Sequence, residues 1–134
     1  MKIVLKIIAS LLLLFNSTGA IYGGLNLIMH PDGGSLQLSP EHLQYSPFTD
    51  YLIPGIILFA ANGLFVFGVL LINHKFFPML IMAQGTILTG WIVIQVLMVH
   101  MTYYLHIVLG TVGLLLILCG WILSGIQEKK IIIK

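Results

Sequence analysis

The chain has 134 residues, of which 59% are hydrophobic and 7% are charged, and its formal net charge is +2 at pH 7. Soluble domains carry about 25% charged residues, so this composition excludes a water-soluble globular protein. The small net charge predicts no nucleic-acid partner. The single cysteine, Cys119, excludes an intramolecular disulfide, a CxxC redox pair and a cysteine-based zinc site. The length predicts one integral membrane domain over 1–134.

The first apolar run, Ile3 to Met29, exceeds the length that a membrane-spanning helix needs, which is about 20 apolar residues. A signal peptide is the alternative, because Lys2 and Lys6 precede the apolar stretch and Ala20 ends a possible cleavage site. Apolar residues continue beyond Ala20, which favours a retained span over residues 4–28.

The segment 30–51 is the long polar stretch of the chain and contains no lysine or arginine. Its Pro31-Asp32-Gly33-Gly34 sequence predicts a turn. The sequence Ser39-Pro40-Glu41-His42-Leu43 predicts the start of a short capped helix. This segment is either an ordered connector, which is the simpler interpretation, or a cap that lies on the outer surface of the bundle.

Three further apolar runs predict spans over 52–73, 76–99 and 103–125. Asp50 is a candidate N-cap for the second span, and Pro54 lies in its first turn or kinks a helix that begins at Pro47. Only a short turn precedes the third span, so the second and third spans form an antiparallel hairpin. We therefore predict an all-α membrane protein, a four-transmembrane-helix bundle with a structured outer loop between the first two helices.

The lysines predict the orientation of this bundle. In a four-span arrangement they all fall on one side, and short loops rich in lysine and arginine stay in the cytoplasm. We expect a multi-pass protein of the cell inner membrane, with both termini cytoplasmic and the loop 30–51 on the outer side. The six lysines are Lys2, Lys6, Lys75, Lys129, Lys130 and Lys134.

Small residues recur at helical spacing in every span, and such residues let helices approach closely in lipid. We expect these stripes to close the bundle, and one of them to face a second copy if the protein is a homo-oligomer. The lipid bilayer is the other expected partner, and no soluble partner is indicated. The stripes comprise Gly19, Ala20, Gly23 and Gly24; Ala60 and Gly63; Ala83, Thr86 and Gly90; and Gly110, Gly113, Gly120 and Ser124.

The polar side chains within the spans are neutral, because no charged residue lies in the middle of any span. This pattern argues against a proton relay or a charged ion pathway. Asn62, Gln84 and Gln95 are expected to form hydrogen bonds between helices. The alternative is that they line, with Trp91, the path of a small neutral or lipophilic molecule through a transporter or channel.

Polar residues also gather at the outer ends of the four spans, beneath the loop. Histidine and methionine can bind copper, and histidine with carboxylate can bind zinc, but the spacing here matches no known metal signature. We expect no metal, no cofactor and no catalytic residue, although a membrane enzyme or a metal- or quinone-binding module stays an alternative. The candidate ligand-binding residues are Asn26, His30, Asp50, Tyr51, Gln95, His100 and His106.

A glycine-rich end of the first span followed by PDGGSLQLSPEHL and SPFTDYLIPGIIL resembles a group of small bacterial four-span integral membrane proteins. The resemblance covers the loop and the first two spans best. It implies an architecture and a bacterial inner membrane, and no activity. A structural or accessory role is the expected function, because no charged residue lies in the middle of a span and the sequence contains no catalytic constellation. The positions that carry the resemblance are Pro31, Asp32, Gly33, Ser46, Pro47, Phe48, Asp50, Tyr51, Pro54 and Gly55.

Overall fold

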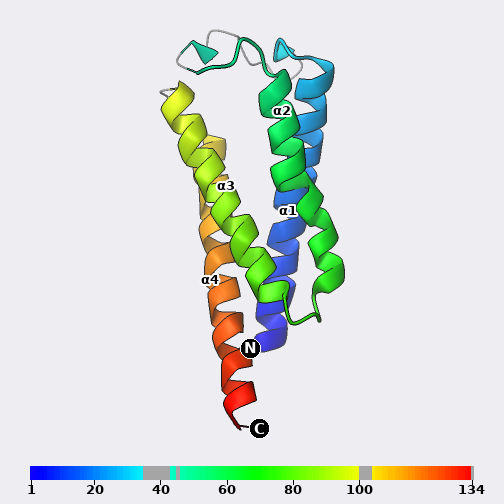
Figure 1. Ribbon diagram of the computed structural model, residues 1–134, viewed down its shortest axis with the longest axis vertical. Helices are drawn as coiled ribbons and strands as arrows, with labels where there is room; N and C mark the ends of the chain where they lie inside the picture. The colour runs from blue at the N-terminus through cyan, green and yellow to red at the C-terminus, as the bar shows by residue number, and fades with distance from the viewer. Residues whose placement is uncertain (35–42, 45, 100–103, 134) are drawn as a thin grey trace.

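The computed structural model describes residues 1–34, 43–44, 46–99 and 104–133. These residues are almost entirely helical, and no strand occurs among them. Four helical rods run alongside one another in alternating directions (Figure 1), and each is long and apolar enough to cross a membrane. The predicted four-helix bundle is confirmed. The rods are α1 (Lys2–Met29); α2 (Leu52–Leu58) with η3 (Phe59–Gly63) and η4 (Leu64–Leu71); α3 (Phe77–Val99); and α4 (Tyr104–Ile133).

The fourth rod is longer than predicted. The apolar run indicated an end near residue 125, but α4 continues through the basic tail to Ile133. Glutamine, glutamate and lysine are good helix formers, and neither proline nor glycine follows Gly125, so nothing in the sequence stops the helix. The tail therefore projects from the bundle beyond the N-terminus (Figure 1).

The second rod begins as the sequence indicates and then departs from a regular α-helix. The backbone N–H of Leu52 donates to the Asp50 carboxylate at 3.0 Å, and Pro54 lies in the first turn. After Leu58 the backbone forms a π-helical turn, η3, and then a 3₁₀ segment, η4. Proline is the usual sequence signal for a helix break, and 59–71 contains none, so a continuous helix was the expectation that the structure corrects.

Glycine pairs set the two closest helix crossings. A Cβ atom at Gly24 would lie 2.9 Å from the carbonyl oxygen of Gly55, and one at Gly55 would lie 3.1 Å from that of Gly24. On the other side of the bundle, a Cβ atom at Gly85 would lie 2.5 Å from the carbonyl oxygen of Gly113. The backbones of α1 and α2, and of α3 and α4, therefore touch directly, as small residues allow in lipid.

The small-residue stripe predicted on the third span does not pack against another helix of the same chain, and a contact of this stripe with a second copy stays a prediction. Ala83, Thr86 and Gly90 are exposed, and α3 packs against α4 through Gly85 instead. The stripe predicted on the fourth span is confirmed at Gly113, which contacts Gly85. Because α3 is apolar around its whole circumference, spacing alone does not select which of two small-residue faces turns inward.

Two apolar clusters hold the bundle together. The larger one joins α1, α3 and α4 and includes Leu13, Ile81 and Leu116, none of which is measurably exposed. The smaller one lies at the end of α1 and α2 that carries the loop, where Leu27, Leu43 and Tyr51 pack together. The described part of the loop therefore folds back on the helix ends.

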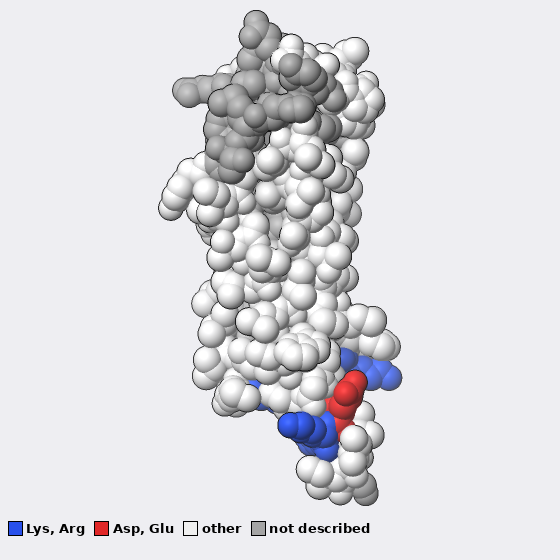
Figure 2. Space-filling model, turned by 90° about the vertical axis from the view of Figure 1, so that its left-hand side faces the viewer, with Lys and Arg blue, Asp and Glu red and all other residues white. Residues whose placement is uncertain are grey.

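Charge is confined to the ends of the molecule. Figure 2 shows lysines gathered at the end that carries both termini, while the long middle of the face drawn there has no charged atom. At this end Lys6 Nζ donates to Asn73 Oδ1 at 3.3 Å, which ties α1 to the turn between η4 and α3. Between the two ends the exposed side chains of the described residues are mostly large and apolar, as lipid contact requires.

Candidate functional site

Two amide side chains meet in the interior of the bundle. Gln84 Nε2 on α3 donates a hydrogen bond of 2.9 Å to Asn62 Oδ1 on η3, and neither residue is measurably exposed. Asn62 lies within the π-helical turn. The predicted hydrogen bonding between helices is confirmed for this pair, and it joins the second rod to the third.

The hydrogen bond between Asn62 and Gln84 leaves one polar atom of each side-chain amide unpaired. Asn62 Nδ2 and Gln84 Oε1 are buried without a hydrogen-bond partner among the described residues. One donor and one acceptor are thus available at the same place. Neutral amides cannot ionise, so this pair can recognise a neutral polar group that both donates and accepts, and it cannot supply a base or a nucleophile.

Helix α1 adds further buried polar groups. Ser10 Oγ, Asn16 Nδ2 and Ser17 Oγ are also buried without a partner among the described residues. A Cβ atom at Gly63 would lie 2.8 Å from Cγ1 of Ile21, so η3 contacts α1 about one turn from Ser17. The interior therefore contains neutral polar groups from three rods, in a region where each unpaired group costs about 1–3 kcal/mol.

The face of α3 that carries Gln84 continues toward the loop end. Leu88 is buried on it, and Trp91 and Gln95 are half-buried. Gln84 and Gln95 are eleven residues apart, about three helical turns, so they lie on the same partly buried face of α3. Two surface hollows of the described residues, an apolar one beside η4 and a partly polar one on α4, are not lined by Asn62, Gln84 or Gln95.

The predicted outer-end residues on the first two rods serve the local backbone. Asn26 Nδ2 donates to the carbonyl of Tyr22 at 2.8 Å within its own helix. The Asp50 carboxylate caps α2 through the N–H of Leu52, and the side chain of His30 is exposed. These groups support the ends of α1 and α2.

Tyr51 holds the base of the loop between α1 and α2. Its ring packs with Leu27 and Leu43, and its backbone N–H donates to the carbonyl of Pro31 at 2.8 Å. Gly33 takes a positive φ of 78° and donates its N–H to the carbonyl of His30 at 2.9 Å, which confirms the predicted turn. The predicted helix that begins at 39–42 lies outside the described residues.

The other predicted residues belong to the second pair of rods. Gln95 lies on α3 and His106 on α4, both half-buried, and the antiparallel register that sets Gly110 opposite Ile92 brings them to similar depth. Helix α2 packs on α1 and does not come within 8 Å, Cα to Cα, of the described parts of α3 or α4. Figure 1 shows the loop-end halves of α1 and α2 beside each other and apart from those of α3 and α4, so the described residues of the predicted site form two groups. His100 lies outside the described residues.

No three His, Cys, Asp or Glu side chains of the described ranges come together in a way that could hold a metal ion. Comparisons with protein-family models, with curated proteins and with solved structures found no match to this chain. The function is therefore argued from the arrangement of its own residues.

Proposed function

We propose that the protein is a small multi-pass protein of the inner membrane with a structural or accessory role and no catalytic one. The observation that carries this proposal is the Asn62–Gln84 hydrogen bond, which uses the interior polar groups to join helices. The outer polar groups support it, since Asn26 and Asp50 bond to backbone within and beside their own helices.

The absorption spectrum and metal content of the detergent-purified protein test this proposal. A structural bundle gives a protein band without visible absorption and less than one metal ion per chain. A stoichiometric metal ion or chromophore that survives purification contradicts the proposed role, because it implies a redox or catalytic centre.

The proposed orientation places both termini in the cytoplasm and the loop outside. It is supported by the lysines at one end and by the rule that basic loops stay inside. In a Cys119→Ser background, Ser46→Cys should react with a membrane-impermeant thiol reagent added to intact spheroplasts. Lys130→Cys should react only after lysis. The reverse pattern rejects this orientation.

A second candidate function is the passage of a small neutral molecule. It is favoured by the break from α- to π- and 3₁₀-helix beside the unpaired Asn62 Nδ2 and Gln84 Oε1, because such irregular turns inside membrane helices often border binding sites. Stopped-flow measurement of water and glycerol permeability in proteoliposomes tests it. Transport predicts a flux above that of protein-free vesicles, which Asn62→Leu abolishes. A flux equal to that of protein-free vesicles supports the structural role.

A further inference from the structure

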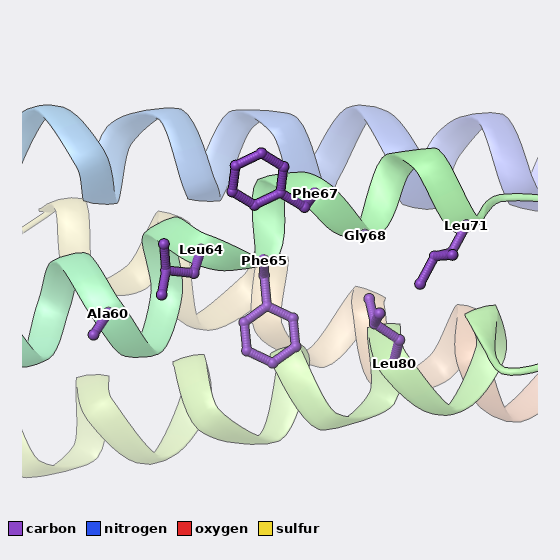
Figure 3. Close-up of a pocket in the computed structure, with 7 residues that line it drawn as sticks. All are labelled: Ala60, Leu64, Phe65, Phe67, Gly68, Leu71 and Leu80. Carbon is purple, nitrogen blue, oxygen red and sulfur yellow. The ribbon is translucent and has the colours of Figure 1, made fainter.

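An open apolar groove of about 290 Å³ runs along the lipid-facing side of the bundle between the second rod and α3. Figure 3 shows its lining, with Phe65 and Leu71 on η4 and Leu80 on the facing helix. Ala60 and Leu64 continue the groove along the second rod. A drug-sized ligand pocket has about 300–1,000 Å³, so this groove accommodates one chain-like apolar group.

Gly68 lies in the middle of the groove. Side chains three residues apart eclipse one another in a 3₁₀-helix, so Phe65, Gly68 and Leu71 form one row along η4. Because Gly68 has no side chain, Leu80 of α3 and Leu13 of α1 come within 2.6 Å and 3.2 Å of the position that its Cβ atom would take. The second rod therefore packs closely on its neighbours at this point, and the groove is the open surface hollow that Phe65, Leu71 and Leu80 border.

The length of the groove matches one leaflet of a bilayer. From Ala60 to Leu71 there are eleven residue steps, which span about 16 Å at the α-helical rise and about 22 Å at the 3₁₀ rise. Half of the hydrocarbon core is about 15 Å. An acyl chain lying in the groove would therefore run from the bilayer centre to the interface at the turn that follows Leu71.

That turn carries positive charge. Lys75 lies in it with its Nζ 5.1 Å from the centre of the Phe76 ring, and Lys6 reaches it through the hydrogen bond to Asn73. Of the described acidic residues, two lie at the opposite end of the bundle and Glu128 lies on α4. An anionic headgroup at the end of the groove would therefore meet two ammonium groups.

We propose that this groove is a binding site for one anionic phospholipid of the leaflet at the lysine end, with an acyl chain against Gly68 and Leu80 and the phosphate at Lys75 and Lys6. The occupant follows from the apolar lining, the one-leaflet length and the charge at one end of the same groove. A lipid that only coats the surface would show no preference for this position.

Native mass spectrometry of the detergent-purified full chain, titrated with phosphatidylglycerol or phosphatidylcholine of the same acyl composition, tests the proposal. We expect one tightly retained phosphatidylglycerol per chain. Lys75→Gln should weaken phosphatidylglycerol retention about fivefold, because one lysine near an anionic surface is worth about that factor. Lys130→Gln, which removes a lysine at the same end but on α4, should leave retention unchanged.

A second pair of variants tests the groove itself. Leu64→Trp fills it and should reduce retention of both lipids, whereas Leu118→Trp, at a residue of almost equal exposure on α4 (50% and 48%), should not. Slow labelling of the buried Cys119, at the wild-type rate, confirms that each variant is folded. Equal retention in the two tryptophan variants, or in the two glutamine variants, overturns the proposal. Competition by inorganic phosphate, or a protein dimer in place of the lipid adduct, overturns it as well.

Discussion

The contact between Gly85 and Gly113 gives a prediction whose size follows from the geometry. In Gly85→Ala, the new methyl group would lie 2.5 Å from the Gly113 carbonyl oxygen and 2.9 Å from the backbone nitrogen of Ile117. Both neighbours are backbone atoms, so they cannot rotate away as a flexible side chain does. To bring the shorter contact from 2.5 Å to an ordinary 3.4 Å, α3 and α4 must separate by about 0.9 Å.

Such a separation weakens the whole α3–α4 interface. A gap of about 0.5–1 Å already forfeits a quarter to a half of the dispersion energy of each facing atom pair, and overpacking typically costs about 1–3 kcal/mol. Gly90→Ala is the matched control on the same helix, because no atom lies within 4 Å of its added methyl group. We expect it to be neutral or to stabilise by up to about 1 kcal/mol through helix propensity.

Cys119 provides the assay, since it is the single cysteine and is only 6% exposed. Its reaction with a thiol-specific fluorophore in detergent reports how often the bundle opens. Gly85→Ala should accelerate labelling about 5- to 150-fold, which corresponds to the expected loss of stability. Labelling rates that are equal in Gly85→Ala and Gly90→Ala would refute the direct backbone contact and the packing derived from it.

Two further predictions concern the amide pair and the loop. Asn62→Leu and Gln84→Leu should each lower the stability of the bundle by about 1–3 kcal/mol, since each change leaves a buried amide unpaired. In the same labelling assay, the double-mutant cycle should give a coupling energy of about 0.6–1.7 kcal/mol. A coupling energy of zero would contradict the hydrogen bond. Gly33→Ala should destabilise the turn by about 1 kcal/mol because of its positive φ, measured as faster proteolysis of the loop in proteoliposomes. Gly34→Ala, whose methyl group would only reach ordinary contact with the Asp32 carboxylate, is the control and should be cleaved like the wild type.

The fold was largely predictable because lipid imposes a simple requirement. Every backbone polar group must be paired within the helix, so four long apolar runs predict four rods, and the turn at Gly33 and the cap at Asp50 follow from local chemistry. The irregular second rod was not predictable from the usual signals. Glycines of this rod lie close to α1 and α3, and local sequence does not record such contacts between helices.

The sequence predicts how deep in the membrane each candidate site residue lies, but not toward which neighbouring helix its side chain points. Sequence position fixes how far a residue lies from the membrane centre, so Asn26, Gln95 and His106 were correctly placed on the loop-end halves of their rods. The direction around each helix was undetermined, because helices that are apolar on every side have no amphipathic face. The sequence therefore did not show that Asn26 lies apart from Gln95 and His106. The groove along Gly68 was missed because its shape depends on the 3₁₀ backbone.

The hydrogen bond from the Tyr51 N–H to the Pro31 carbonyl makes the loop between α1 and α2 a closed ring with a fixed base. Of the 19 residues between these two, Leu43 packs with Leu27 and Tyr51, so this cluster also ties the ring to the helix ends. Lengthening a closed loop is inexpensive, since each doubling costs only about 0.6 kcal/mol of closure entropy. An epitope tag or a reporter domain that is inserted between Gly34 and Leu43 should therefore leave the packing of the helices intact, provided that Leu43 keeps its contacts.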